Sequence, residues 1–267
     1  MKKLILSVCL MLTATMIVHA QDYSLYQKYW LLQGSDTMPY RVLLPLNYDS
    51  TKTYPVVFFL HGSGERGNDN EKQLVHGASL FLKDDIRKNF PAIVIFPQCA
   101  AGGYWSNTIR TFDAGQKEHY HFLPGGEPTT AMRVLQELVR YVLQTYPVKK
   151  DQVYVGGLSM GGMGTFELVR RSPGVFAAAF PICGGADPAT AKNLTAVKWW
   201  IFHGGKDDVV LTAFSEKMVA ALKEENATVK FTLYPEANHN SWDAAFAEPG
   251  LLPWLFAQHN PAFKIVK

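Results

Sequence analysis

The chain is poor in cysteine and in charge, and each scarcity argues against a class of protein. Three cysteines in 267 residues are too few for a scaffold held together by disulfides. Charged residues make up only 18% and the formal net charge is +3, which gives no reason for binding to nucleic acid. Internal repeats, low-complexity tracts and linker-like stretches are also missing, so nothing indicates a second domain. What remains, at 48% hydrophobic, is typical of one globular domain.

Long apolar runs are equally scarce, and the longest one lies close to the first residue. Residues 1–3 are Met-Lys-Lys, residues 4–18 are mostly apolar, and the small residue Ala20 follows. This pattern is typical of a secretory signal peptide, whereas a transmembrane anchor would need about 20 apolar residues. We therefore expect residues 1–20 to be removed, which takes away two lysines and leaves residues 21–267 with a net charge of +1. Such a protein would be periplasmic or extracellular, with no stable insertion in the membrane.

Cys99 and Cys183 are the cysteines that would survive this cleavage. In an oxidising compartment the two could form a disulfide, but the sequence does not give the distance between them. Both lie beside apolar, strand-like segments. Free and buried thiols are the interpretation that this placement favours.

Strand-like and helix-like segments alternate along the rest of the chain. Short runs rich in Val, Ile, Phe and Tyr predict strands at residues 29–33, 40–46, 54–60, 92–96, 152–155, 177–182, 198–202 and 228–234. The first two flank the turn-forming Gly34-Ser35-Asp36, which predicts an opening hairpin. Apolar residues at steps of three and four predict helices at 129–146 and 212–225, and the tail at 241–259 suggests a closing helix. This alternation is typical of a mainly parallel α/β sheet covered on both faces.

One segment does not fit this alternation. Residues 99–128 hold Gly, Trp, Tyr, His and Pro without a regular apolar period. The segment is too long for an ordinary connection, and we expect it to be a loop over the active site.

A nucleophile motif stands between a predicted strand and a helical pattern. Gly157-Leu158-Ser159-Met160-Gly161 matches G-x-S-x-G. An attacking hydroxyl must stand clear of the backbone in a turn so tight that side chains on its neighbours would clash, and the two glycines remove those clashes. The helix that follows points its positive end at the site. We expect Ser159 to be the nucleophile of an acyl-transfer enzyme.

Serine needs a base within hydrogen-bond reach, and a third group must orient that base. In strand–turn–helix sites of this kind the order along the chain is serine, acid, histidine. Asp207 and Asp208 follow one later strand, and His239 ends the next. Spacing alone does not choose between the two acids. Of the eight histidines only His239 follows the acid at a strand end, so we expect it to be the base.

An oxyanion forms when a carbonyl is attacked, and preorganised backbone N–H groups must stabilise it. One donor is expected from Met160, the residue after the nucleophile. The other should come from a loop after an early strand. Residues 59–67 end in Gly62-Ser63-Gly64-Glu65-Arg66-Gly67, and we expect the N–H of Ser63 to be this donor.

These motifs together resemble a known family. They are similar to those of bacterial α/β-hydrolase esterases of the polyhydroxybutyrate-depolymerase and feruloyl-esterase type, near carbohydrate esterase family 1 and the prolyl-oligopeptidase hydrolases. The resemblance rests on residues 60–67, Phe96-Pro97-Gln98-Cys99, residues 157–162, residues 203–210, and His239 with Trp242. In the family pattern H-G-x-x-D-x-x-V the acid falls on Asp207. The resemblance implies an α/β-hydrolase catalytic domain at 21–267 and a serine esterase that removes acetyl or feruloyl groups from plant polysaccharides or oligosaccharides.

Two functions other than an esterase are compatible with parts of this sequence. A peptidase of the prolyl-oligopeptidase type normally carries an additional propeller domain, for which a mature chain of this length has no room. A non-catalytic polysaccharide-binding protein with this fold would have no use for all three groups at their strand ends.

Residues for substrate recognition are harder to choose. Gln98, Trp105 and Trp242 lie near the predicted site by chain position and could line a pocket for an acyl group or a sugar, although aromatic residues are as often part of the core. Glu65 and Arg66 are expected to form a local ion pair, with substrate contact as the alternative. His119 and His121 lack the further ligands of a zinc site, and we expect neither a metal nor an organic cofactor.

Overall fold

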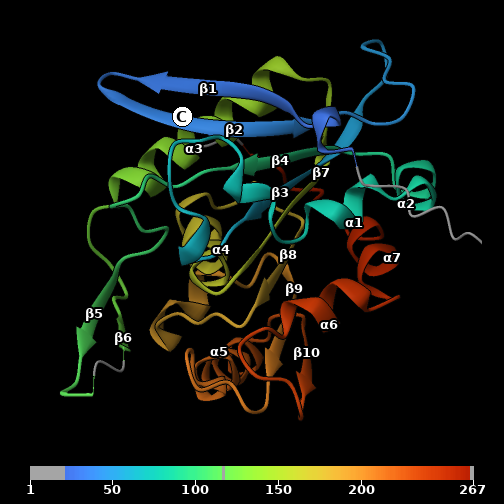
Figure 1. The fold of residues 1–267 in the computed structure, drawn as a ribbon. Helices are drawn as coiled ribbons and strands as arrows, with labels where there is room; N and C mark the ends of the chain where they lie inside the picture. Colours follow the sequence, from blue (N-terminus) through green and yellow to red (C-terminus); the bar gives the residue numbers. More distant parts are fainter. Residues whose placement is uncertain (1–21, 116–117, 265–267) are drawn as a thin grey trace, which may run out of the picture.

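A twisted eight-stranded sheet with helices on both faces makes up the protein in the computed structural model (Figure 1), which describes residues 22–115 and 118–264. The expected signal peptide at 1–20 lies outside the described residues. Across the described part of the chain, no helix combines the length and the hydropathy needed to cross a membrane.

The sheet has the predicted topology. Its strands are β1 Gln27–Gln33, β2 Asp36–Leu43, β3 Tyr54–Leu60, β4 Ile93–Pro97, β7 Val148–Leu158, β8 Ala178–Ile182, β9 Lys198–Gly204 and β10 Val229–Tyr234. They are arranged in the order β1-β2-β4-β3-β7-β8-β9-β10. The hairpin of β1 and β2 is antiparallel, β2 is antiparallel to β4, and all remaining pairs are parallel. The mainly parallel α/β sheet with an opening hairpin is thus confirmed.

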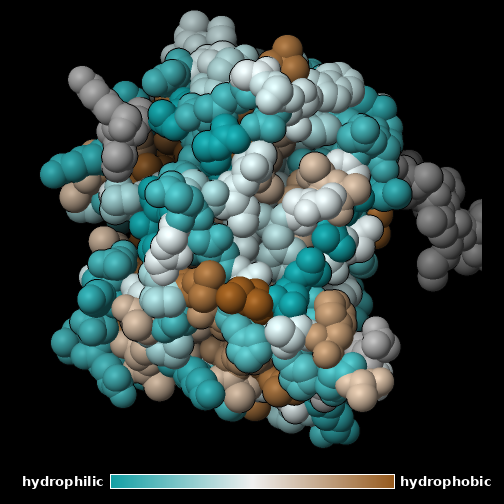
Figure 2. Space-filling view, turned by 90° about the vertical axis from the view of Figure 1, so that its left-hand side faces the viewer, coloured by the Kyte–Doolittle hydropathy of each residue, from teal (hydrophilic) through white to brown (hydrophobic). Residues whose placement is uncertain are grey.

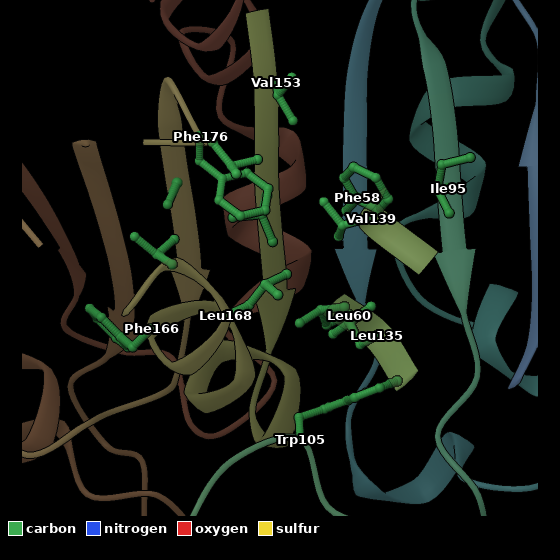
Figure 3. Packing of buried hydrophobic residues seen from close by; sticks show 14 of the residues in the cluster. Phe58, Leu60, Ile95, Trp105, Leu135, Val139, Val153, Phe166, Leu168 and Phe176 are labelled. Carbon is green, nitrogen blue, oxygen red and sulfur yellow. The ribbon is translucent and has the colours of Figure 1, made fainter. Parts of the chain in front are cut away.

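Three helices cover one face of the sheet: α3 Thr130–Thr145, α4 Met160–Arg171 and α5 Thr212–Glu224. The helix α3 begins at Thr129, whose hydroxyl accepts a hydrogen bond from the Met132 N–H, and ends just before Pro147, which disfavours helix at the residue preceding it. Its buried apolar stripe packs on the sheet: in Figure 3 Val139 lies beside Phe58 and Leu135 beside Leu60. These helices fix the position of the turn between β7 and α4.

Four short helices lie on the other face: α1 Ala78–Leu82, α2 Asp84–Asn89, α6 Trp242–Ala247 and α7 Leu251–Phe256. The single closing helix expected at 241–259 was therefore wrong. Glu248, in an extended conformation, stands before Pro249, and Gly250 follows, so the tail forms two helices instead of one. The break lets α6 and α7 each turn an apolar side toward the sheet.

The segment 99–128 contains a second, two-stranded sheet that the sequence did not reveal. The strands β5 Thr108–Phe112 and β6 Glu118–Phe122 pair antiparallel and project from the body of the molecule (Figure 1). Most of their side chains are exposed, so they lack the apolar alternation by which a strand is recognised. The described residues also form four short 3-10 turns: Tyr23–Leu25, Ser63–Glu65, Lys72–Leu74 and Pro188–Asn193.

Candidate active site

Ser159 occupies the sharp turn between β7 and α4. Its φ of 53° lies in the left-handed region, a strained conformation for a residue with a side chain. Its N–H donates to the Ile182 carbonyl at 2.9 Å, which ties the turn to the end of β8. A Cβ on Gly157 would stand 2.4 Å from the Gly161 carbonyl oxygen, and one on Gly161 would stand 1.9 Å from the Leu60 carbonyl oxygen. Both glycines of the motif are therefore required by close packing.

The structure brings the three predicted residues together at the carboxyl ends of β7, β9 and β10. Nε2 of His239 lies 2.9 Å from Oγ of Ser159. Nδ1 of the same ring lies 2.8 Å from Oδ2 of Asp207. Because the carboxylate can only accept, Nδ1 carries the proton and Nε2 is left to accept the serine proton. This is the tautomer that a general base needs.

Asp207 is the acid that reaches His239, while its neighbour Asp208 is exposed. Oδ1 of Asp207 accepts from the N–H groups of Val209 at 3.0 Å and Val210 at 2.9 Å. Burial by itself would raise the pKa of Asp207, but hydrogen bonds from His203, His239 and the Val210 N–H outweigh burial and hold that pKa well below its usual range. The group is therefore a fixed negative charge behind the imidazole.

His203 is a second histidine on the same carboxylate. Its Nε2 lies 2.8 Å from the Val210 carbonyl oxygen and 3.2 Å from Oδ2 of Asp207. Both partners are acceptors, so Nε2 carries a proton. Nδ1 is hydrogen-bonded to Oγ of Ser215 at 2.7 Å, and the whole ring is buried. His203 thus clamps the loop that presents Asp207.

The loop after β3 lies against the nucleophile. Gly62 packs so close that a Cβ on it would stand 3.7 Å from Cβ of Ser159. Ser63 follows as the first residue of a 3-10 turn and is exposed, and Met160 is the first residue of α4. The N–H groups of a first helical turn have no partner within the helix, so both are oriented as donors. Their service as oxyanion donors stays a prediction.

His61 holds this loop in place as a neutral ring. Its Nε2 accepts from the Cys99 N–H at 2.9 Å, so Nδ1 carries the proton and donates to the Gly62 carbonyl at 2.6 Å. Burial lowers the pKa of His61 to about 4, which keeps it uncharged at neutral pH. Every polar atom of the ring is thus used for structure.

Gln98 and Trp105, two of the three residues expected to contact the substrate, are buried, so for these two the expectation was wrong. Gln98 is fully buried, with Oε1 accepting from the Asn70 N–H and Nε2 donating to the Glu65 carbonyl and to Asp69. Trp105 is also fully buried, with its indole N–H donating to the His61 carbonyl. Figure 3 shows it within the core cluster beside Leu135. Neither side chain can contact a substrate, because each is enclosed by packing and its polar atoms already have hydrogen-bond partners in the protein.

Trp242 is different, because it is only half-buried and its ring lies beside the ring of His239. Its ring lies 5.4 Å from the His239 ring, edge to face, and 5.1 Å from the His76 ring. Position in the chain could not have pointed to His76, which lies in the bend between the 3-10 turn Lys72–Leu74 and α1. Trp242 remains a candidate for substrate contact.

The expected ion pair between Glu65 and Arg66 is wrong. Arg66 donates instead to the carbonyl oxygens of Ser63 at 2.8 Å and Gly103 at 3.3 Å. The carboxylate of Glu65 faces His76, with 3.8 Å between Oε1 and Nε2. The two neighbours therefore point into different surroundings.

The segment 99–128 lies beside the site, on the side shown in Figure 2. Tyr120 of β6 packs against Met163 in the first turns of α4 and against Val210 in the loop of Asp207. Hydrophilic side chains predominate on the face shown in Figure 2, but Ile109 and Phe112 of β5 leave half or more of their surface exposed. The segment therefore lies near the site as a projecting hairpin, and its place over the site stays a prediction.

Cys99 and Cys183 are free and buried, as the sequence favoured. Cys183, with a φ of 42°, directly follows β8. Its thiol, the Asp207 carboxylate and the His239 ring have ligand atoms within 4.8 Å of one another. Burial raises the pKa of the Cys183 thiol well above its ordinary value, and the other two groups already bond to each other. Such a set favours a hydrogen-bonded cluster over a metal site, since metals bind the thiolate.

Chemically, this arrangement can activate a hydroxyl for attack on a carbonyl. The serine sits on a strained turn, its proton has an acceptor in the imidazole, and a buried carboxylate fixes that ring.

Comparison with known proteins agrees with this geometry. Residues 35–245 match the model of the family Esterase, described as "Putative esterase". The chain belongs to this family. The prediction of an α/β-hydrolase esterase is thereby confirmed at the level of the family and the fold.

Three of the individual proteins that match share less than a third of their residues with this chain. A thermostable esterase of known structure is 29% identical with a TM-score of 0.78, and the match covers 88% of this chain and 64% of that one, so the chain spans less than two thirds of it. Lysophospholipase-like protein 1 of Mus musculus is 25% identical over 68% of this chain and 79% of its own. A ferulic acid esterase of Anaeromyces mucronatus, solved with ferulic acid, is 15% identical with a TM-score of 0.63 over 87% and 90% of the two chains. That last likeness shows the fold alone.

Proposed function

We propose that the protein is a secreted serine carboxylic-ester hydrolase that works through an acyl-enzyme, with Ser159 as nucleophile, His239 as general base and Asp207 as the orienting acid. The observation that carries the proposal is the unbroken hydrogen-bonded chain from Oγ of Ser159 through the imidazole to the buried carboxylate. Secretion rests on the pattern of residues 1–20.

The first half of the reaction acylates the enzyme. Oγ of Ser159 attacks the ester carbonyl while Nε2 of His239 takes its proton, and the Asp207 carboxylate stabilises the imidazolium that forms. The oxyanion receives hydrogen bonds from the N–H groups of Met160 and Ser63, each worth about 2.7–4 kcal/mol in comparable sites. The imidazolium then gives its proton to the departing alcohol, and the acyl group remains on the serine.

The second half returns the enzyme to its first state. A water molecule gives a proton to Nε2 of His239 and attacks the acyl carbon through the same oxyanion donors. Collapse of this second tetrahedral intermediate releases the carboxylic acid, and the proton held by the imidazole returns to Oγ of Ser159. No group other than those already in the site is required for either half.

Acyl groups on plant polysaccharides or oligosaccharides are the proposed substrates. Support comes from the fold shared with a ferulic acid esterase and from the motifs that resemble carbohydrate esterases. Half-buried Trp242 offers a ring for stacking on a sugar or an aromatic acyl group.

The proposal is tested with Ser159→Ala. The variant should lose at least about 10⁴-fold in kcat on 4-nitrophenyl acetate and on methyl ferulate, because the triad acts as a unit. Thermal unfolding followed by circular dichroism checks that the variant remains folded. Unchanged turnover in a folded variant would rule the mechanism out.

A further inference from the structure

Glu65 places a carboxylate next to the nucleophile. Its side chain is only 13% exposed. A Cβ built on Gly62 would lie 3.0 Å from Oε2 of Glu65 and 3.7 Å from Cβ of Ser159, so both side chains border the space beside this glycine. A negative charge at this position meets whatever binds beside the serine.

The same carboxylate continues a wall that leads to the proposed base. Oε1 of Glu65 lies 3.8 Å from Nε2 of His76. The His76 ring packs on Trp242, and Trp242 packs on His239. Because His239 must protonate the departing alcohol, this wall of Glu65, His76 and Trp242 borders the space where the alcohol part of the ester lies.

Glu65 has unused hydrogen-bonding capacity. The distance of 3.8 Å from Glu65 to His76 is too long for a hydrogen bond. Among residues 22–115 and 118–264, no other side chain or backbone group donates a hydrogen bond to the Glu65 carboxylate. Arg66, the nearest cation in sequence, donates to two carbonyl oxygens instead. A carboxylate oxygen without a donor from the protein can accept a hydrogen bond from a ligand, so the site suits a ligand that brings a donor.

We propose that Glu65 is a specificity-determining residue that accepts a hydrogen bond from a hydroxyl on the alcohol part of the substrate, next to the scissile ester. The substrate class is therefore an ester of a polyol or sugar with a free neighbouring hydroxyl, and Trp242 supplies the apolar surface beside it. This inference rests on the proposed esterase function. It adds which half of the ester is recognised, and by which group.

The test compares two esters that differ only in the hydroxyl. Ethylene glycol monoacetate and 2-methoxyethyl acetate have similar leaving groups, but only the first has a hydroxyl that can donate a hydrogen bond. After correction for their hydrolysis by hydroxide, the wild type should prefer the glycol ester by about tenfold or more in kcat/KM, the size of a hydrogen bond to a charged group. Glu65→Gln should reduce this preference to about threefold or less, and Glu65→Met should abolish it.

Controls separate this effect from a general loss of activity. Turnover of 4-nitrophenyl acetate, whose alcohol part has no such hydroxyl, measures in each Glu65 variant any loss of activity that does not depend on the hydroxyl, and the preference between the two acetates is corrected for it. Asp243→Asn removes an equal charge from the exposed first turn of α6 and should leave the preference intact. The near-isosteric Glu65→Gln decides the matter if Glu65→Met does not fold.

Two results count against the inference in different ways. A preference that is absent in the wild type, or unchanged in both Glu65 variants, overturns the role of Glu65 and leaves the esterase function intact. No hydrolysis of any of the three esters by the wild type removes the proposed function, and this inference with it.

Discussion

The carboxyl edge of the sheet has two halves that carry similar residues and use them differently. In the first half, after β7, β9 and β10, Ser159 and His239 each keep one side in contact with solvent. In the second half, after β3 and β4, His61 and Gln98 are completely buried. Both halves present polar residues at strand ends, so position alone does not distinguish them.

What distinguishes the two halves is whether hydrogen-bonding capacity is left over. Both nitrogens of His61 and both polar atoms of Gln98 have partners within the protein, so these side chains support the loop and can do nothing else. In the first half the chain of hydrogen bonds ends at a hydroxyl whose proton can be removed. A polar residue at a strand end is therefore a candidate for chemistry only when the fold leaves part of it unsatisfied.

One substitution in each half of the sheet edge tests this difference most strongly. His239→Ala should lower kcat on 4-nitrophenyl acetate by about 10⁴-fold or more, with little change in stability, because the base is lost and the fold is not. Gln98→Ala should do the reverse: it leaves the buried Asn70 N–H without its acceptor, which costs about 1–3 kcal/mol, while kcat stays within about tenfold. Steady-state kinetics and urea unfolding measure the two quantities. Equal losses of activity in both variants would contradict the division.

A second pair of substitutions compares the adjacent acids. Asp207→Asn should lower kcat by about 10³–10⁴-fold, because an amide neither fixes the required tautomer nor stabilises the imidazolium. Asp208→Asn, at an exposed position, should stay within about twofold. Comparable losses in both variants would show that the loop as a whole, and not the Asp207 carboxylate, is what matters.

Stability against pH sharpens this pair. The folded-state pKa of Asp207 is depressed, so the carboxylate contributes stability that is present above its unfolded pKa of about 3.9 and is lost as the pH falls through the lower folded value. The wild type should therefore exceed Asp207→Asn by roughly 2–3 kcal/mol at neutral pH, and the difference should shrink below about pH 4. A difference that grew in acid would have the wrong sign.

The smallest expected effects on catalysis come from the two tryptophans. Trp105→Ala should cost about 3–5 kcal/mol of stability, since it empties a site in the core. Trp242→Ala should cost much less stability and raise KM for a feruloyl ester several-fold. Unfolding in denaturant and Michaelis–Menten kinetics separate these outcomes. A KM effect confined to Trp105→Ala would return that residue to the pocket.

Sequence reasoning placed the sheet and the three central residues because each leaves a local signal. The apolar runs predict the buried strands, and the glycines around Ser159 are forced by contacts of 1.9–2.4 Å that any side chain would make. Order along the chain then selects His239, and the family pattern selects Asp207 over Asp208.

Other features have no such signal. Gln98 and Trp105 follow a strand end just as Asp207 does, and only the packing of α3 and the loop of His61 shows that they are enclosed. The exposed hairpin of β5 and β6 lacks an apolar period. The wall of Glu65, His76 and Trp242 joins residues far apart in the chain through contacts between side chains, which no motif records.

The most direct measurement is the site of covalent modification by a serine-directed sulfonyl fluoride. The reagent reacts much faster with a serine hydroxyl that a neighbouring base activates than with other side chains. Intact-mass and peptide mass spectrometry should therefore find the first adduct on Ser159, formed in parallel with loss of esterase activity and absent from His239→Ala. Complete loss of activity with Ser159 unmodified, or an equally fast adduct in His239→Ala, would contradict the account.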